Sequence, residues 1–155
     1  CSGNSARSIF AEAILNGIEG GRFQAFSAGT RPGTSLNPFA VELLERNGYD
    51  VSSLRSKHIS EFEAADAPHM DFVFTVCDAA ADEECAPWPG QPITAHWGLP
   101  DPVKATGNDA EKALAFAEAF RTLNKRITNF SALSLENLDS IARQEAVDEI
   151  GRTHL

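Results

Sequence analysis

Apolar residues recur with helical spacing in the N-terminal third of the chain. Residues 9–15 and 39–44 are mostly apolar or helix-forming, and an Asn-Gly pair, a common helix stop, follows them at Asn16-Gly17 and Asn47-Gly48. Asn37-Pro38 has the residue types preferred at an N-cap and at the first helical position. These patterns predict one helix in each segment.

Three shorter segments have the patterns of strands. Residues 22–28 alternate polar and apolar side chains, as a half-exposed strand does. Residues 71–77 are almost continuously apolar, which is typical of a strand buried on both faces of a parallel sheet, and we expect this strand at the centre. A third strand is predicted at residues 92–97, after a surface loop at 78–91.

The C-terminal part predicts two more helices. Five apolar residues at spacings of four, three, four and three indicate a long amphipathic helix, and they are Phe116, Phe120, Leu123, Ile127 and Phe130. A last helix is expected to reach about Ile150 and to stop at Gly151. Strands that alternate with helices predict an α/β fold with a parallel sheet, whose ligands bind beyond the carboxyl ends of the strands.

Length and charge narrow the class of protein. The 155 residues suit one domain, 1–155, which is long enough to bury a core of its own. The net charge of −9 argues against nucleic-acid or anionic-membrane partners, so an anion site must be local. Three cysteines without a signal peptide or a long apolar run indicate a reducing cytoplasm.

The most informative motif is the first eight residues, Cys1-Ser2-Gly3-Asn4-Ser5-Ala6-Arg7-Ser8. Small residues let successive backbone N–H groups turn inward as an anion-binding nest, and the following helix adds its positive N-terminal end. Arg7 can donate two parallel hydrogen bonds to one oxyanion. The same donors stabilise a thiolate, which lowers the pKa of Cys1 from its free value of about 8.5. We expect Ser2 to Ser8 to bind a tetrahedral oxyanion that Cys1 attacks.

The alternative interpretation of this motif is a chance spacing, with Cys1 a small apolar residue. The helix that follows at once favours the anion site. Such a loop normally follows a buried strand, so we expect the first strand of the sheet to be missing before Cys1. Glu12 and Ser27 could brace the loop through Asn4 or Ser8, although surface or capping roles fit them equally well.

Two further cysteines flank the loop that follows the 71–77 strand. Cys77 and Cys85 can form a disulfide if their Cα atoms come within about 7 Å. Taken alone, they could equally be two unrelated cysteines, one buried and one exposed. A nucleophilic Cys1 favours a relay instead, in which Cys77 attacks an adduct on Cys1 and Cys85 then resolves the product.

Asp101 lies between two prolines after the 92–97 strand, and the rigid backbone on both sides suits a general acid. An ordinary Asp-Pro turn is the alternative. The four histidines lack metal-ligand spacing, so no metal site is expected, and His96 is interpreted as structural.

The chain resembles the arsenate reductases built on the low-molecular-weight protein tyrosine phosphatase fold. The resemblance covers nearly the whole chain and is carried by four motifs: residues 1–8, Phe26-Ser27-Ala28-Gly29, Val73-Phe74-Thr75-Val76-Cys77, and His96-Trp97-Gly98-Leu99-Pro100-Asp101-Pro102. It implies a three-layer sandwich with a short parallel sheet flanked by helices.

The resemblance also implies a chemistry. Cys1 would attack arsenate, Arg7 and the loop amides would hold it, and Asp101 would assist the departure of oxygen. Cys77 and then Cys85 would carry the oxidation outward, and a thioredoxin-like partner would reduce the Cys77–Cys85 disulfide. This activity would serve arsenic detoxification, in a monomer without a bound cofactor.

Besides the missing first strand, one further departure and two rival functions accompany the resemblance. The gap between Cys77 and Cys85 is about one residue longer than in the thioredoxin-coupled members, which leaves the thiol donor open. A tyrosine phosphatase would use Cys1, Arg7 and Asp101 unchanged, but it would need neither Cys77 nor Cys85. A non-catalytic anion-binding module or a redox-sensing regulator is the other alternative, although a binding module would need neither the nucleophile nor the pinned aspartate.

Overall fold

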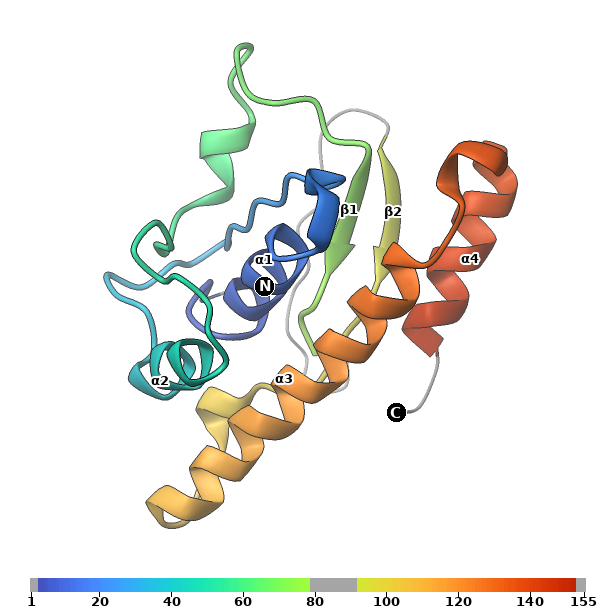
Figure 1. Cartoon of the computed structure of the whole chain (residues 1–155). Helices are drawn as coiled ribbons and strands as arrows, with labels where there is room; N and C mark the ends of the chain where they lie inside the picture. Colours follow the sequence, from blue (N-terminus) through green and yellow to red (C-terminus); the bar gives the residue numbers. More distant parts are fainter. Residues whose placement is uncertain (1–2, 79–91, 153–155) are drawn as a thin grey trace.

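The computed structural model describes residues 3–78 and 92–152 (Figure 1). Its longer elements are α1 (Arg7–Asn16), α2 (Pro38–Arg46), β1 (Phe72–Thr75), β2 (Ile93–His96), α3 (Asp109–Ser131) and α4 (Ser140–Arg152). Within the described residues, short 3-10 helices lie between them: η1 (Glu19–Gly21), η2 (Ile59–Phe62), η4 (Pro102–Lys104) and η5 (Leu135–Asn137). The predicted helices are confirmed, and α3 extends seven residues before the apolar stripe that indicated it. The predicted stop at Gly151 is wrong, because α4 includes Gly151 and ends at Arg152.

β1 and β2 pair in parallel, in a register that runs from Phe72 opposite Ile93 to Thr75 opposite His96. α4 contacts β2, and α3 contacts α1, α2 and α4. In Figure 1, α3 crosses in front of the strands, with α1 and α2 on one side of it and α4 on the other. The parallel α/β arrangement is confirmed, and the three-layer sandwich stays a prediction.

The helix ends follow from their capping residues. The Asn37 side chain accepts a hydrogen bond from the Phe39 amide at 2.9 Å, directly before Pro38 at the first helical position. α3 starts with a capping box, because the Asn108 side chain accepts from the Glu111 amide while the Glu111 side chain accepts from the Asn108 amide. These bonds satisfy amides that no helical carbonyl can reach.

Aromatic rings fill the core between α3 and the sheet. Phe74 of β1 stacks on Trp97 with ring centroids 3.9 Å apart, and Phe130 of α3 meets both rings edge-on. Phe10 of α1 meets Phe116 of α3 in the same edge-on manner. The stripe predicted for α3 therefore faces the core.

The prediction of a strand at residues 22–28 is wrong, because this segment does not pair with another strand in the described part of the structure. The segment is extended, but among the described residues it joins no ladder, and only Gly29 forms an isolated parallel bridge with His58. A cavity of about 840 Å³ separates it from β1. Because the segment does not reach β1, neither can supply the other's backbone hydrogen bonds.

The same cavity explains a second correction. Residues 71–77 were expected to form a central strand buried on both faces, but the four residues of β1 are only half-buried. In the described part of the structure, β1 pairs with β2 alone, so it lies at an edge of the sheet. The remaining edge faces the cavity.

Several predictions fall outside the described residues. Cys1, Ser2, Cys85 and most of the predicted loop at 78–91 belong there. The strand expected before Cys1 stays a prediction. Within residues 3–78 and 92–152, no helix combines the length and the apolar character that crossing a membrane requires.

Candidate active site

The loop that leads into α1 is built around Asn4. Its backbone is in the left-handed region, with φ 48°, which asparagine tolerates better than most residues. The fully buried side chain donates to Ser8 Oγ at 2.8 Å and to Ser27 Oγ at 3.0 Å, and it accepts from the Lys57 amide at 2.9 Å. Asn4 therefore fixes the shape of the loop through its side chain.

The carbonyl groups of the loop are held from outside. The amides of Gly33 and Asn37 donate to Gly3 O and Ser5 O at 3.3 and 3.1 Å, and Ser56 Oγ donates to Asn4 O at 2.7 Å. In a planar trans peptide, the N–H of the next residue points the opposite way. The amides of residues 4–6 therefore turn to the other side of the loop, as an anion-binding nest requires.

A buried ion pair lies under the loop. Ser27 Oγ donates to Glu12 Oε1 at 2.8 Å, and Lys57 Nζ lies 3.4 Å from the same oxygen. The side chains of Lys57 and Glu12 are only 7% and 10% exposed, and Lys57 Nζ also donates to Arg55 O at 2.9 Å. Glu12 and Ser27 thus brace the loop through Asn4, one of the two roles considered for them. Sequence patterns had not indicated Lys57, because no spacing marks a buried lysine.

The segment that carries Lys57 is held by an exposed pair. Arg55 binds both carboxylate oxygens of Glu61, with contacts of 2.9 and 2.5 Å. This hydrogen bonding lowers the pKa of Glu61 and raises the pKa of Arg55. Both side chains lie at the surface, so solvent screens the pair.

Arg7 connects the loop with two distant segments. Its Nη1 donates to Val76 O at 3.2 Å and to Leu99 O at 3.1 Å, and its Nη2 lies 3.3 Å from Asp101 Oδ2. The residue is 2% exposed. The guanidinium is therefore fixed where the loop, the end of β1 and the turn after β2 converge.

Asp101 caps the turn that its sequence context allowed and also faces Arg7. Oδ1 accepts from the Val103 amide at 3.0 Å and caps η4, as an Asp-Pro turn does. Oδ2 faces Arg7, and the side chain keeps 16% of its surface exposed. One oxygen is thus used for the turn, while the other lies beside the predicted oxyanion site.

The third predicted participant, Cys77, follows Val76 directly and is 1% exposed. It is disulfide-bonded in the structure. The structure therefore brings together Gly3 to Ser8, Asp101 and the end of β1 that leads to Cys77, whereas Cys1, Ser2 and Cys85 lie outside the described residues. In the described ranges, no three His, Cys, Asp or Glu side chains are grouped to hold a metal ion.

Comparison with known proteins places this arrangement in a family. The model of the low molecular weight phosphotyrosine protein phosphatases matches residues 1–145. The chain belongs to this family. A family member named arsenate reductase, from Halalkalibacterium halodurans, is 36% identical over 131 residues, which cover 84% of this chain and 91% of that relative.

The chain is also similar to solved structures of arsenate reductases. An arsenate reductase in the phosphate-binding state has a TM-score of 0.65 and 26% identity, and the match covers 85% of this chain and 92% of that one. A thioredoxin-dependent arsenate reductase from Corynebacterium glutamicum has a TM-score of 0.54 and 24% identity, with 83% and 59% covered. The second similarity shows the fold alone.

Proposed function

We propose that this chain reduces arsenate to arsenite by a relay of three thiols. The observation that carries the proposal is the position of Arg7, whose guanidinium joins the loop after Cys1 to Asp101 and to the carbonyl directly before Cys77. The Arg7 guanidinium thus lies next to both the predicted oxyanion site and the residue that precedes the second thiol, Cys77. The proposal is also supported by the relative that is 36% identical over most of the chain, which is named arsenate reductase.

In the first step, the Cys1 thiolate attacks arsenic in arsenate and forms a sulfur–arsenic bond. The amides of residues 2–8 and the Arg7 guanidinium hold the arsenate oxygens. One arsenate oxygen leaves as water, and Asp101 supplies a proton to it. Arsenic is still pentavalent in this adduct.

In the second step, the Cys77 thiolate attacks the sulfur of Cys1. The electron pair of the sulfur–arsenic bond moves to arsenic, which leaves as trivalent arsenite, and a Cys1–Cys77 disulfide forms. Cys85 then attacks Cys77 and releases the Cys1 thiolate. A dithiol donor of the thioredoxin type reduces the resulting Cys77–Cys85 disulfide. Cys77 is disulfide-bonded in the structure, which supports its place in the relay.

The test is a coupled assay with arsenate, thioredoxin, thioredoxin reductase and nicotinamide cofactor, in which oxidation of the cofactor is followed by absorbance. We expect arsenate-dependent oxidation that Cys77→Ser and Cys85→Ser both abolish. Thr94→Ser, on an exposed position of β2, is the matched control and should leave the rate unchanged. No arsenate-dependent oxidation with any of several thiol donors would contradict the proposal.

A phosphatase is the second candidate, because the matching family model describes phosphotyrosine protein phosphatases and because Cys1, Arg7 and Asp101 would suffice for ester hydrolysis. The residues after Asp101-Pro102 argue against it. Val103, which is 45% exposed, and Lys104 follow directly, and neither has an aromatic ring that could stack on the phenol ring of a phosphotyrosine. Fast hydrolysis of a phenyl phosphate without arsenate reduction would favour this candidate.

A further inference from the structure

The carboxyl end of the sheet places a histidine and a threonine beside Cys77. Phe72 and Phe74 of β1 face one side of the sheet, so Thr75 faces the other by the alternation of a strand. His96 lies opposite Thr75 in the register of β2, so the two side chains share that face. Cys77 follows two residues after Thr75, at the end where both strands stop.

The Thr75 hydroxyl orients the His96 ring. Thr75 Oγ1 and His96 Nδ1 are 2.7 Å apart. A hydroxyl oxygen can accept from an Nδ1–H group, and that tautomer leaves Nε2 without a hydrogen and able to take one. The hydrogen bond thus fixes the direction of the ring, and in the tautomer in which Nδ1 donates, Nε2 is the nitrogen left for other chemistry.

The missing side chain of Gly98 brings Nε2 close to Cys77. A Cβ atom at Gly98 would stand 2.4 Å from His96 Nε2 and 2.6 Å from Cys77 O, so both atoms lie within 2.6 Å of the same point. Only glycine leaves this point empty. The imidazole therefore lies over the Gly98 backbone, directly beside the Cys77 main chain, and its exposed edge remains open to solvent.

We propose that, when the disulfide of Cys77 is reduced, His96, oriented by Thr75, accepts the proton of the Cys77 thiol. The proton moves from Sγ to Nε2, the sulfur keeps the electron pair as a thiolate, and the resulting imidazolium stabilises that thiolate. The importance of this step for arsenate reduction rests on the function proposed above, because Cys77 is the second nucleophile there. Proton transfer itself requires no arsenate, so it can be tested separately.

Charged groups from the neighbouring elements also lie near Gly98, beside His96 and Cys77. Asp78 after β1, Arg126 of α3 and Arg152 of α4 line a cavity of about 1010 Å³ together with Gly98. Arg126 Nη1 lies 3.3 Å from Gly98 O, and burial lowers the pKa of Arg126. Asp148 of α4 accepts from Gln144, which also binds β2. All these groups are present in every variant tested, so a difference between the His96 variant and its parent reports the imidazole.

The test uses the full chain with Cys1→Ser and Cys85→Ser, which leaves Cys77 as its single thiol. Thiolate absorbance at 240 nm is followed against pH, with and without His96→Gln. We expect the pH at which half of the thiol is ionised to rise by about one in His96→Gln, which means roughly tenfold less thiolate at pH 7. Thr75→Val should also raise the pH of half-ionisation, because it removes the hydroxyl that orients His96. Thr75→Ser keeps a hydroxyl and should leave this pH at the value of the parent chain.

The matched control is His69→Gln, because His69 is exposed near the start of β1, at the far end of the strand. This change should leave the titration of Cys77 unmoved. Far-ultraviolet circular dichroism checks that each variant is folded, and Thr75→Val provides the test if His96→Gln does not fold. Coincident titrations with and without His96 overturn the inference. If the titration shifts but arsenate is not reduced, only the proposed function fails.

Discussion

Arg7 shows at the scale of one residue how the site depends on the shape of a side chain. It reaches two carbonyls and one carboxylate from a single planar guanidinium. A lysine has the same charge but only one nitrogen, so it cannot hold three separated acceptors and two oxygens of an oxyanion in one plane.

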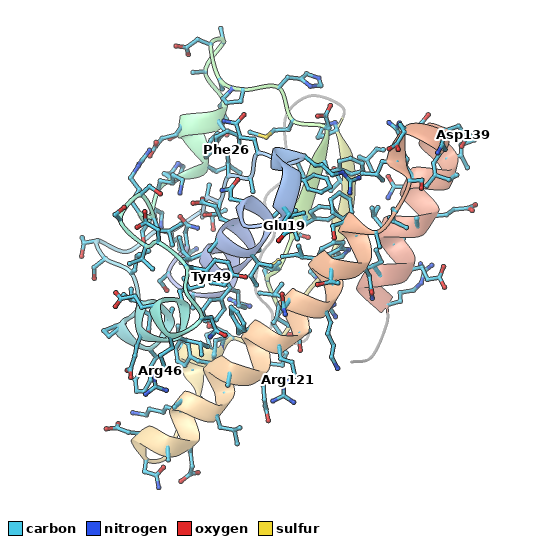
Figure 2. All side chains as sticks on the ribbon, viewed as in Figure 1. Glu19, Phe26, Arg46, Tyr49, Arg121 and Asp139 are labelled. Carbon is cyan, nitrogen blue, oxygen red and sulfur yellow. The ribbon has the colours of Figure 1, made fainter. Side chains whose placement is uncertain are left out.

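We therefore predict that Arg7→Lys lowers kcat/KM for arsenate by about 100-fold or more. The coupled assay under initial-rate conditions measures this. Arg121→Lys is the matched control, because Arg121 is exposed on α3 and points away from the body of the molecule (Figure 2). Equal losses in the two variants would mean that Arg7 has no special role.

Lys57 and Glu12 give a prediction about stability. Removing the ammonium leaves a buried carboxylate without its cation, so Lys57→Met should lower the free energy of unfolding by about 3 kcal/mol. Glu12→Gln added to it should recover a large part of this loss, since no buried charge then remains. Urea denaturation of the single and double variants measures both effects.

The exposed Lys125→Met on α3 is the control for these variants and should change stability little. A double variant that loses as much as the sum of the two singles would show that the two side chains do not interact.

At the scale of elements, sequence patterns predicted the helices best. Their ends are local events, determined by Asn37, the Asn108–Glu111 capping box and the Asn-Gly stops, and each can be read from a few neighbouring residues. The pairing of residues 22–28 could not be read in this way. An alternating pattern indicates an extended segment, but a strand also requires a partner at hydrogen-bonding distance, which depends on tertiary structure.

The Arg55–Glu61 ion pair predicts how the stability of the folded chain depends on pH. The pKa of Glu61 is lower in the folded chain than its ordinary value of 4.5, mainly because Arg55 donates to it. Its contribution to stability is therefore fully present above about pH 4.5 and is lost as the pH falls through the folded value. We expect Glu61→Gln to be less stable than the unchanged chain at pH 7, and this small difference to vanish below the folded pKa of Glu61.

Urea midpoints measured at several pH values check this expectation, and 1 M salt should reduce the difference at pH 7 because the pair is exposed. Glu63→Gln, two residues further on, is the control. A difference between Glu61→Gln and the unchanged chain that persists at pH 2 would show that charge is not its cause.

At the scale of the whole molecule, sequence patterns marked residues that the fold brings together, but they gave no indication of how these residues are held. Three segments with recognisable residue types, the loop after Cys1, the end of β1 and Asp101, converge because they lie at the same edge of a parallel arrangement. No sequence pattern indicated that Lys57 and Ser56 hold the loop after Cys1 in place. Their roles depend on burial and on contacts across more than 40 residues of chain.

The cavity between residues 22–28 and β1 has a consequence for hydrogen exchange. Asp71 O accepts from the amide of Ile93 in β2, and Thr75 O accepts from the amide of Trp97 directly after β2. By alternation, the amides of Phe72 and Phe74 therefore point to the cavity, whereas those of Val73 and Thr75 point to β2. In deuterated solvent, neighbouring amides of one short strand should therefore exchange at very different rates, fast at Phe72 and Phe74 and slowly at Val73 and Thr75. Uniform protection along β1, resolved amide by amide in NMR spectra, would show that solvent does not enter the cavity.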